Sequence, residues 1–428
     1  MASLAIPLPV EQQSEPLRAE QQSEPLRVEQ SAAPPLEPPA ALPSLPPLLG
    51  TYVRAPMELV SGEGVELVDA DGRRYLDFTS GIGVSALGYG DRGFQDVVST
   101  ALASGLVHVS NLFRTRPGEE LAELLVARSF ASSVFFCNSG AEANEGAFKF
   151  ARRWGRTVHG PAKAEIVALR GSFHGRLFAT LAATDRPQYR TAFKPVAPGV
   201  SIAERDLESL AQALSSDTTA AVVLEPVQGE GGVRVLDPGF LRELRALTTE
   251  RGIALILDEV QCGLGRTGRL FAYEHSGITP DMVTLAKPLA GGLPMGAILV
   301  AGHVARTISP GDHATTFGGG PLVAAAARYV FGRVSDPVLL ESVRGNGEWL
   351  GCRLREIARA SGRARGVRGQ GYMWGVDVRE PATAVVRRGW DAGILMLTAG
   401  EHTLRLLPPL VTTRQQLRSG LQLIEEVL

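Results

Sequence analysis

Two residues with complementary chemistry stand at the ends of two apolar runs. Asp258 follows the run at residues 253–257, and Lys287 follows the run at residues 282–286. Short apolar runs of this kind are typical of strands buried on both faces of a sheet, and ligands of open α/β sheets bind outside the carboxyl ends of such strands. There a lysine can form a Schiff base with an aldehyde, and an aspartate can partner a pyridinium nitrogen. A surface lysine and a helix-capping aspartate remain an alternative for these two residues alone.

A third strand end has the features of an anion site. The strand predicted at residues 133–137 runs into Ser139, Gly140 and Ala141, and a helix follows to about residue 156. The free N–H groups and the positive dipole end of a helix attract a phosphate, and small residues let the backbone approach it closely. A helix that is simply capped by Ser139 is the alternative.

Side chains after two further predicted strands could bind a flat or acidic ligand. Phe173 could stack on a planar ring, and Arg176 could bind a carboxylate. Both could equally serve loop packing, and a lone histidine such as His174 is more often structural than catalytic. Glu225 follows a buried strand and would need a partner there.

An arginine lies inside an apolar run near the end of the chain. We expect residues 403–410 to form an edge strand that is stopped by Pro408 and Pro409. Arg405 in this run needs a partner or a ligand carboxylate, because a buried charge is costly when it is left alone. The hydroxyl and glycine residues at 315–320 precede a predicted helix and could form a second anion contact.

The elements around these residues predict an α/β fold. Strand and helix patterns alternate from about residue 95 to 330, which is typical of a mostly parallel sheet flanked by helices. The rest predicts a smaller α+β domain, with a hairpin at 65–78. We therefore divide the chain into a tail at 1–49, an N-terminal segment of the small domain at 50–95, a large cofactor-binding domain at 96–334 and a C-terminal small domain at 335–428.

The first 49 residues are expected to be disordered. Residues 1–50 hold 11 of the 28 prolines, and the sequence Glu-Gln-Gln-Ser-Glu-Pro-Leu-Arg occurs at 11–18 and again at 20–27. Such a composition cannot bury enough apolar surface to offset the entropy lost on ordering. Its six Glu and two Arg argue against an organelle transit peptide, and no basic segment of a secretory signal precedes its first apolar residues.

Composition and charge exclude several classes of function. The 428 residues are 44% hydrophobic and carry a net charge of −2, which is ordinary for a soluble globular protein and predicts no attraction to nucleic acid. No apolar run approaches the roughly 20 residues of a membrane span. Cys137, Cys262 and Cys352 are too widely spaced for a disulfide framework or a metal site, so we expect reduced thiols, a cytoplasmic location and no metal.

From about residue 50 onward, the chain resembles the class III, fold-type I aminotransferases that use pyridoxal 5'-phosphate (PLP). Within that class it looks most similar to the acetylornithine aminotransferases. The segments that carry the resemblance have the family's order and spacing, and they are Ser110-Asn-Leu-Phe113, Ser139-Gly-Ala-Glu-Ala-Asn-Glu145, Ser172-Phe-His-Gly-Arg176, Glu225-Pro-Val-Gln-Gly-Glu230, Leu257-Asp-Glu-Val-Gln-Cys-Gly-Leu-Gly-Arg-Thr-Gly268, Ala286-Lys-Pro-Leu-Ala-Gly-Gly292, Thr316-Phe-Gly-Gly319 and Leu404-Arg-Leu-Leu-Pro-Pro409.

The resemblance implies a catalytic pair and a set of cofactor contacts. Lys287 would hold PLP covalently and move the substrate proton, and Asp258 would keep the ring nitrogen protonated. The other implied cofactor contacts are Gln261 at the phenolic oxygen, Phe173 stacked on the ring, Ser139, Gly140 and Ala141 at the phosphate, and Thr316 at the phosphate of the neighbouring subunit in a homodimer.

The resemblance also implies a reaction with two substrates. The terminal (delta) amine of N-acetylornithine would pass to 2-oxoglutarate, giving N-acetylglutamate semialdehyde and glutamate, a step of arginine biosynthesis. Arg405 would bind the α-carboxylate of glutamate, and Glu230 would pair with Arg405 when the terminal-amine substrate is bound. Arg176 would bind the carboxylate of N-acetylornithine, with Thr315 nearby.

Other functions remain open alternatives. These are an aminotransferase for ornithine, succinylornithine, 4-aminobutyrate or acetyl-lysine-type substrates, an aminomutase of the same fold, and a non-catalytic cofactor-binding protein. An aminomutase would not need Arg405 for an external acceptor. The sequence departs from the family at residues 88–93, where Gly-Tyr-Gly-Asp-Arg-Gly stands in place of Gly-His-x-His-Pro. We interpret this element as structural, so the departure concerns loop packing more than catalysis.

Overall fold

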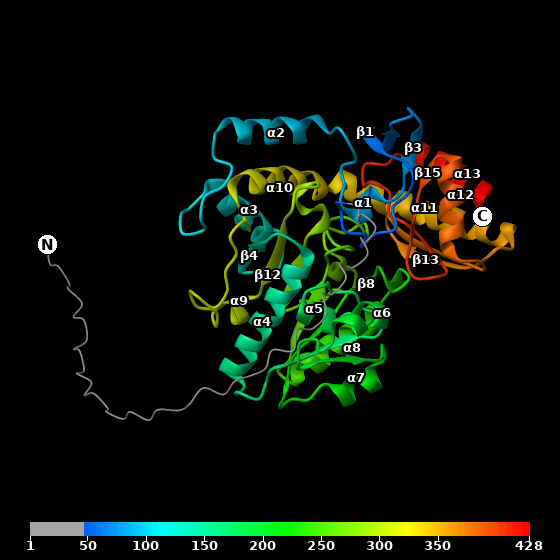
Figure 1. Cartoon of the computed structure of the whole chain (residues 1–428). Coiled ribbons are helices and arrows are strands. Elements are labelled where there is room, and N and C mark those ends of the chain that lie inside the picture. Colours follow the sequence, from blue (N-terminus) through cyan, green and yellow to red (C-terminus); the bar gives the residue numbers. More distant parts are fainter. Residues whose placement is uncertain (1–46) are drawn as a thin grey trace, which may run out of the picture. The chain divides into compact units, whose positions relative to one another are not determined.

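A seven-stranded sheet forms the centre of the molecule (Figure 1). Every neighbouring pair in it is parallel except the two pairs made by β12, which runs antiparallel to both β11 and β4. The predicted mostly parallel sheet is therefore confirmed. In order across the sheet, the strands are β4 (Ser133–Cys137), β12 (Gly296–Val300), β11 (Met282–Leu285), β10 (Ala254–Asp258), β7 (Thr219–Leu224), β5 (Glu165–Leu169) and β6 (Val200–Ala203).

The structure of the protein is a computed structural model, and it describes residues 47–428. Residues 57–428 form one compact unit, to which the following description refers. Nearly all of the predicted tail at 1–49 lies outside the described residues. Among the residues that the structure describes, no helix combines the length and the apolar character needed to cross a membrane.

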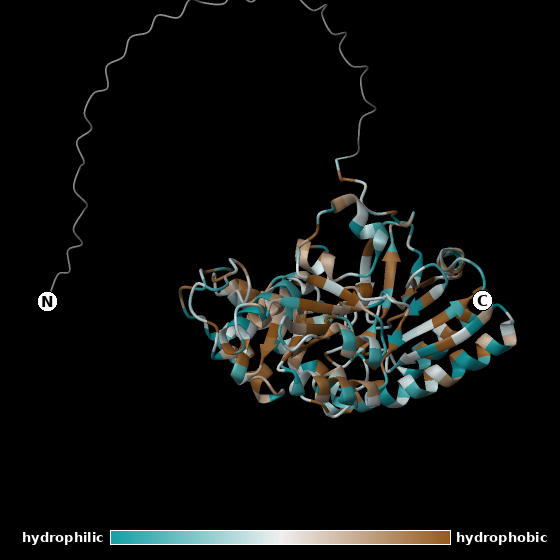
Figure 2. Cartoon of the chain, turned by 90° about the horizontal axis from the view of Figure 1, so that it is seen from below, coloured by the Kyte–Doolittle hydropathy of each residue, from teal (hydrophilic) through white to brown (hydrophobic). Residues whose placement is uncertain are grey.

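The apolar runs of the sequence become the buried centre of this sheet. All residues of β7, β10, β11 and β12 are buried. The two runs that precede Asp258 and Lys287 are the neighbours β10 and β11, which pair in parallel. Figure 2 shows strands in hydrophobic colours in the interior, with hydrophilic residues on the outer helices. Adjacent parallel strands bring their carboxyl ends, and hence these two residues, to one edge of the sheet.

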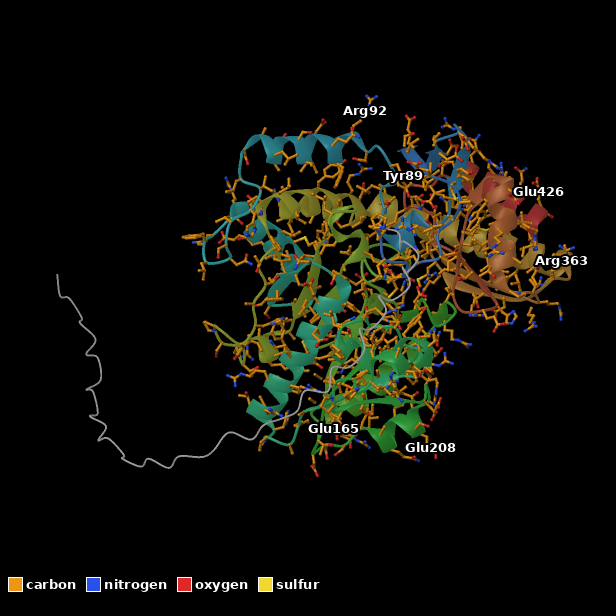
Figure 3. The ribbon with its side chains drawn as sticks, viewed as in Figure 1. Tyr89, Arg92, Glu165, Glu208, Arg363 and Glu426 are labelled. Carbon is orange, nitrogen blue, oxygen red and sulfur yellow. The ribbon has the colours of Figure 1, made fainter. Side chains whose placement is uncertain are left out.

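Helices cover the central sheet. The longest of them, α4 (Gly140–Val158), packs against β7, β10, β11 and β12 through an apolar face that includes Phe148 and Ala151. Charged side chains elsewhere in this part, such as the labelled Glu165 and Glu208, point outward (Figure 3). The other helices of this part are α2 (Arg92–Ala103), α3 (Arg116–Ala127), α5 (Phe178–Ala182), α6 (Pro187–Arg190), α7 (Leu207–Ala213), α8 (Pro238–Glu250), α9 (Gly302–Ala305) and α10 (Pro321–Val334), with short 3₁₀ turns at η1 (Thr191–Phe193), η2 (Ala272–His275) and η3 (Lys287–Ala290).

A second sheet carries Arg405. Its order is β13 (Ala364–Gln370), β14 (Met373–Val378), β17 (Thr403–Leu406) and β16 (Leu397–Thr398), and α11 (Pro337–Ser361) packs on β13 and β14. The prediction of an edge strand at 403–410 was wrong, because β17 pairs with β14 on one side and with β16 on the other. The two prolines end the strand but lie beyond its paired residues.

The two ends of the described unit meet in a third sheet. It consists of β1 (Leu59–Glu63), β2 (Glu66–Asp69), β3 (Arg74–Asp77) and β15 (Ile394–Leu395), and β15 pairs in parallel with β3. The predicted hairpin is present as β2 and β3, with Gly72 at a φ of 80° in its turn. α12 (Ala382–Ala392) and α13 (Arg414–Val427) pack nearby, and the short α1 (Ser80–Gly83) follows β3. The domain boundaries at residues 95 and 334 stay a prediction.

The segment that departs from the family pattern is held by its own contacts. The hydroxyl of Tyr89 donates to Asp77 Oδ2 at 2.7 Å. Asp91 accepts from the backbone N–H of Phe94 and so caps α2, and it also accepts from the hydroxyl of Tyr329 at 2.7 Å and pairs with Arg333 at 2.9 Å. Tyr89 and Asp91 therefore hold this loop in place through their own hydrogen bonds.

Candidate active site

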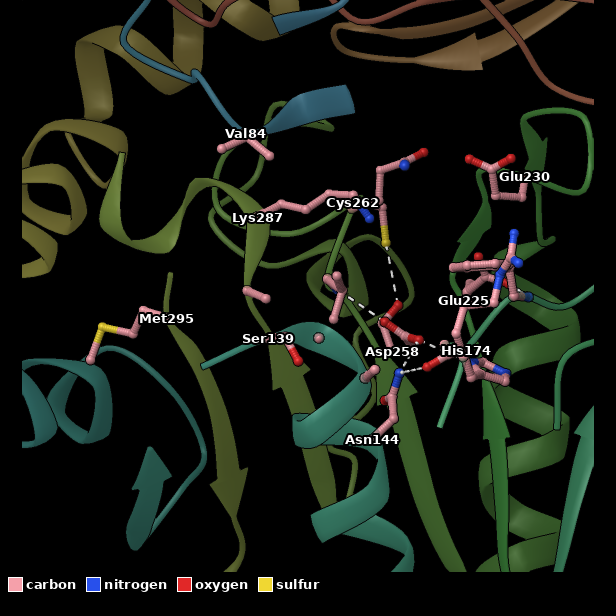
Figure 4. A pocket seen from close by; sticks show the side chains of 18 of the residues that line it. Val84, Ser139, Asn144, His174, Glu225, Glu230, Asp258, Cys262, Lys287 and Met295 are labelled. Carbon is pink, nitrogen blue, oxygen red and sulfur yellow. Dashed lines mark hydrogen bonds and ion pairs between the residues drawn. The ribbon is translucent and has the colours of Figure 1, made fainter. Parts of the chain in front are cut away.

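A cavity of about 400 Å³ opens at the carboxyl ends of the central strands (Figure 4). Its walls are the segments that follow β4, β5, β7, β10 and β11. Three of the twelve predicted site residues do not line it: Thr315, Thr316 and Arg405. The nine that the structure brings together there are Ser139, Gly140, Ala141, Phe173, Arg176, Glu230, Asp258, Gln261 and Lys287.

Asp258 forms the floor of this cavity and is fixed by three donors. Its Oδ2 atom lies 2.7 Å from both Asn144 Nδ2 and His174 Nδ1, and its Oδ1 accepts from the backbone N–H of Val260 at 3.0 Å. The amide of Asn144 is in turn oriented by the hydroxyl of Thr284 at 2.7 Å. These hydrogen bonds satisfy the buried carboxylate and hold it in one orientation.

The structure shows two contributors to this floor that sequence reasoning missed. Asn144 lies one turn into α4, and its position one helical turn past the small-residue segment was the available signal. His174, interpreted from the sequence as more often structural than catalytic, is buried against Asp258. The sequence does not show that either residue contacts Asp258, because each contact joins residues that lie 84 or more positions apart.

The titratable groups at the floor influence one another. Burial disfavours the charged form of His174, but the hydrogen bond and charge of Asp258 outweigh burial and raise the pKa of the imidazole. Burial raises the pKa of Glu225 to about 7, in opposition to the nearby His174. Glu225 accepts from the backbone N–H of Phe173 at 3.1 Å. The buried carboxylate of Glu225 therefore finds the partner that it needs in the backbone of the loop that carries Phe173, beside the cavity.

Lys287 approaches the cavity from the end of β11. It is the first residue of η3, where Pro288 favours the start of a helical turn, and Figure 4 shows its side chain extending across the cavity. Burial lowers the pKa of Lys287, and the nearby Arg405 acts in the same direction, whereas Asp258 opposes both. A lowered pKa increases the share of neutral amine, which is the nucleophilic form.

The small-residue segment reaches the cavity at the start of α4. Ser139 is the N-cap, and its hydroxyl accepts from the backbone N–H of Glu142 at 3.2 Å. Gly140 is required by close packing, since a Cβ there would lie 2.6 Å from Val260 Cγ1. The helix N-terminus is thereby held beside the segment that leaves β10, with its dipole directed at the cavity.

Arg405 is connected to this cavity by its ion pair with Glu230, which lines the cavity. Its Nη1 donates to Glu230 Oε1 at 2.7 Å and to Gln261 Oε1 at 3.3 Å, and its side chain is only 3% exposed. Its Nε is buried and has no hydrogen-bond partner among the described residues. The guanidinium is therefore covered by Glu230 and retains donor capacity for a carboxylate.

Arg176 and the two threonines lie at the periphery. The Arg176 guanidinium stacks on the ring of Tyr189, 3.6 Å from its centroid, and lies 5.7 Å from that of Phe173. Tyr189 is a further contact that the sequence did not indicate. Thr315 and Thr316 line a separate cavity of about 770 Å³, and Thr315 Oγ1 accepts from Asn138 Nδ2 at 3.3 Å. Within one chain, the structure does not bring Thr316 to the first cavity.

Residues 51–428 match the model of the family described as Aminotransferase class-III. The chain belongs to the class III aminotransferases. Among relatives of this class III aminotransferase, the acetylornithine aminotransferase of Gloeobacter violaceus is 46% identical over 386 residues, which are 89% of this chain and 95% of the relative. That of Methanocaldococcus jannaschii is 41% identical over 380 residues, again 89% and 95%.

Solved structures of class III aminotransferases have the same fold. The N-acetylornithine aminotransferase of Stenotrophomonas maltophilia is 35% identical, with a TM-score of 0.77 over 88% of this chain and 96% of that one. The ornithine aminotransferase of Toxoplasma gondii is 28% identical, with a TM-score of 0.85 over 89% and 92%. The predicted family, fold class and type of enzyme are thus confirmed.

Class III aminotransferases depend on PLP, and the residues of the cavity fit this cofactor. A helix N-terminus for a phosphate, a fixed carboxylate for a ring nitrogen and a lysine of lowered pKa for an aldehyde face one space. The buried Arg405 Nε without a partner is a donor that a substrate carboxylate would satisfy.

Proposed function

We propose that this class III aminotransferase transfers the terminal amine of N-acetylornithine to 2-oxoglutarate, giving N-acetylglutamate semialdehyde and glutamate in arginine biosynthesis. The observation that carries the proposal is the 2.7 Å ion pair between Arg405 and Glu230. A terminal-amine donor brings no carboxylate close to the reacting carbon, so Arg405 must be neutralised while this donor is bound. Glutamate does bring one, and it must displace Glu230 to reach Arg405. The names of the relatives from Gloeobacter violaceus and Methanocaldococcus jannaschii support this donor.

The floor residues would hold PLP in one orientation. Asp258 would accept from the protonated ring nitrogen, and Gln261 would bond the phenolic oxygen. Phe173 would stack on the ring, and Ser139, Gly140 and Ala141 would hold the phosphate at the N-terminus of α4. When bound, PLP supplies an electron sink for the carbanion at the substrate carbon. Asn144 and His174 would maintain this arrangement by fixing Asp258.

Lys287 would hold the cofactor and would also move a proton. Its neutral amine, favoured by burial, would join the cofactor aldehyde. Once a substrate amine has released it, the same amine would take the proton from the substrate carbon as a general base, and then return it on the cofactor side as a general acid.

Arg176 would hold the far end of the donor. Its stacking on Tyr189 directs the guanidinium beside the cavity without neutralising its charge. It would bind the α-carboxylate of N-acetylornithine, and the side-chain carboxylate of glutamate in the second half of the reaction. Arg176 would therefore serve both substrates, whereas Arg405 would bind only glutamate.

We propose a homodimer in which Thr316 reaches the phosphate of the partner's cofactor. Thr316 is exposed and lies beside the strongly exposed Leu112, Phe113 and Phe317. Clustered exposed apolar side chains are typical of protein interfaces. A monomer in analytical ultracentrifugation would contradict this assembly. We also propose a cytoplasmic location, since the three thiols are free in the structure.

One assay tests the proposed reaction. Purified enzyme loaded with PLP is mixed with N-acetylornithine, ornithine, succinylornithine or 4-aminobutyrate, and the loss of the visible absorbance band of the bound cofactor is followed. We expect the largest kcat/KM for N-acetylornithine and no reaction in Lys287→Ala. A larger value for ornithine would favour that alternative donor. If Arg405→Ala weakened the reactions of glutamate and N-acetylornithine equally, the division of labour between the two arginines would be wrong.

A further inference from the structure

Glu230 stands at the tip of a hairpin. The strands β8 (Val227–Gln228) and β9 (Arg234–Val235) pair antiparallel, and residues 229–233 connect them. We call residues 227–235 the Glu230 hairpin. Because Glu230 covers Arg405 from this hairpin, the position of the hairpin decides whether Arg405 is open to a ligand.

The hairpin fits tightly against its surroundings. A Cβ at Gly229 would lie 2.0 Å from Gln261 Oε1, and one at Gly231 would lie 2.7 Å from the carbonyl oxygen of Gly171. Val233 has a φ of 52°, a conformation that costs a branched residue free energy and persists where neighbouring contacts impose it. The contacts that hold this backbone therefore also set the place of Glu230.

One of these contacts connects the hairpin to the strand of Arg405. Arg368, on β13, donates from Nε to the carbonyl oxygen of Gly232 at 2.7 Å. Its Nη2 donates to Asp377 Oδ1 at 2.8 Å and to Thr403 Oγ1 at 3.3 Å, and its Nη1 binds the other oxygen of Asp377. Thr403 stands on β17 two residues before Arg405, and its hydroxyl also donates to Asp377 at 2.6 Å.

A second arginine, from another segment of the chain, also binds the hairpin. Arg186 Nη2 donates to the carbonyl oxygen of Glu230 itself at 2.5 Å. Arg186 comes from the segment before α6, whereas Arg368 belongs to the sheet that carries Arg405. Of the two, Arg368 is the one that couples the hairpin to β17, and it does so through a planar group with donors in fixed directions.

We propose that Arg368 is a specificity-determining positioning residue, which holds the Glu230 hairpin so that Glu230 covers Arg405. It would thereby set the balance between terminal-amine donors, which leave Arg405 covered, and five-carbon dicarboxylates, which need it open. This inference rests on the proposed function. A dicarboxylate must displace Glu230, so its affinity is reduced by the share of molecules in the covered state. Loosening the hairpin lowers that share.

Glutarate tests the proposal by binding alone, since it carries two carboxylates and no reacting amine or carbonyl. We expect Arg368→Met, in PLP-loaded enzyme, to lower the Kd of glutarate about fivefold in isothermal titration calorimetry. The matched control is Arg388→Met. Arg388 also binds a carboxylate with both nitrogens, that of Glu380, and a backbone carbonyl, that of Val427, but it does not contact the hairpin. General damage to the fold would weaken glutarate binding rather than strengthen it.

Two further measurements connect this effect to Glu230. In a Glu230→Ala background, Arg368→Met should change the Kd of glutarate by less than about 1.5-fold, because the two changes act through one contact. The ratio of kcat/KM for N-acetylornithine to that for glutamate should fall in Arg368→Met and stay constant in Arg388→Met. If Arg368→Met does not fold, Thr403→Val removes one connection to β17 and should shift the Kd in the same direction by a smaller factor.

The outcomes separate the two proposals. An unchanged or raised Kd of glutarate in Arg368→Met, or an equal change in Arg388→Met, would overturn the role of Arg368. A wild-type enzyme that binds glutarate but does not react with N-acetylornithine would overturn the proposed donor, while the glutarate comparison would still report on the hairpin.

Discussion

His174 Nδ1 lies 2.7 Å from Asp258 Oδ2, and both side chains are buried below the cavity. Asp258 ends β10, whereas His174 follows β5, with β7 between the two strands. The contact therefore joins the end of β10 to the loop that follows β5, across the end of β7. His174 Nε2 is buried without a hydrogen-bond partner among the described residues, and the charge of Glu225 favours the protonated ring. The aspartate of the candidate site is thus supported by a buried imidazole from another segment of the chain.

Removing this support should weaken catalysis without unfolding the protein. His174→Phe keeps a ring of similar size but leaves Asp258 with only Asn144 and Val260 as donors. Loss of a hydrogen bond to a charged group is worth about 1.5–3 kcal/mol, so we expect kcat to fall at least about tenfold. The control His159→Phe changes a histidine that packs on Trp154 outside the cavity. Equal kcat values in wild type and His174→Phe would contradict the supporting role.

Glu225 makes stability depend on pH. Burial raises its pKa from 4.5 to about 7, so the folded state binds this proton more tightly than the unfolded chain does. Its contribution to stability is therefore complete below about pH 4.5 and is lost as the pH rises through about 7. We expect the thermal midpoint of Glu225→Gln to decline less than that of the wild type across this range. The exposed Glu165→Gln is the control, and parallel curves for wild type and Glu225→Gln would refute the assignment.

The sheet and the residues at its carboxyl edge were predictable because their signals are local. Five-residue apolar runs specify buried strands, and a residue that ends such a strand must emerge at the sheet edge. Asp258, Lys287 and the segment from Ser139 were found in this way, and the structure places all of them around one cavity. The family resemblance then related Arg405 to Glu230, which no local pattern connects.

What escaped prediction depends on contacts between distant parts of the chain. The pairing of His174 with Asp258 and the connection from Arg368 to Gly232 span 84 and 136 positions. Neither residue type is unusual in its own segment, so periodicity carries no sign of these contacts. The edge-strand error has a different origin: β16 pairs with β17 nearby in the sequence, but its two residues are too few to produce a pattern.

The loop that departs from the family pattern should matter for stability and not for catalysis. Asp91→Ala removes the cap of α2 together with the contacts to Tyr329 and Arg333, so we expect a loss of about 2–3 kcal/mol in the free energy of unfolding. Asp206→Ala is the control, because Asp206 caps α7 at an exposed site, and should cost about 1 kcal/mol. A drop in kcat/KM of the folded Asp91→Ala enzyme would show that this loop influences the active site.

The start of α4 offers a test with a built-in rescue. In Gly140→Ala the new methyl group would lie 2.6 Å from Val260 Cγ1 and 2.9 Å from Cγ2. The helix N-terminus must then move away from the segment after Asp258, which would separate the phosphate site from the ring site. Overpacking of this kind costs about 1–3 kcal/mol, so we expect the Kd for PLP to rise about tenfold.

The rescue distinguishes steric displacement from other effects of the substitution. Val260→Ala removes both methyl groups that the new Cβ would meet, so Gly140→Ala/Val260→Ala should recover most of the lost affinity. Val260→Ala alone should bind PLP nearly as well as the wild type, because only the backbone N–H of Val260 supports Asp258. Equilibrium titration of the apoenzyme with PLP measures all four proteins. If the double variant bound as weakly as Gly140→Ala, the absence of a side chain at 140 would serve the backbone or the phosphate directly, and the close packing against Val260 would not be the reason for glycine.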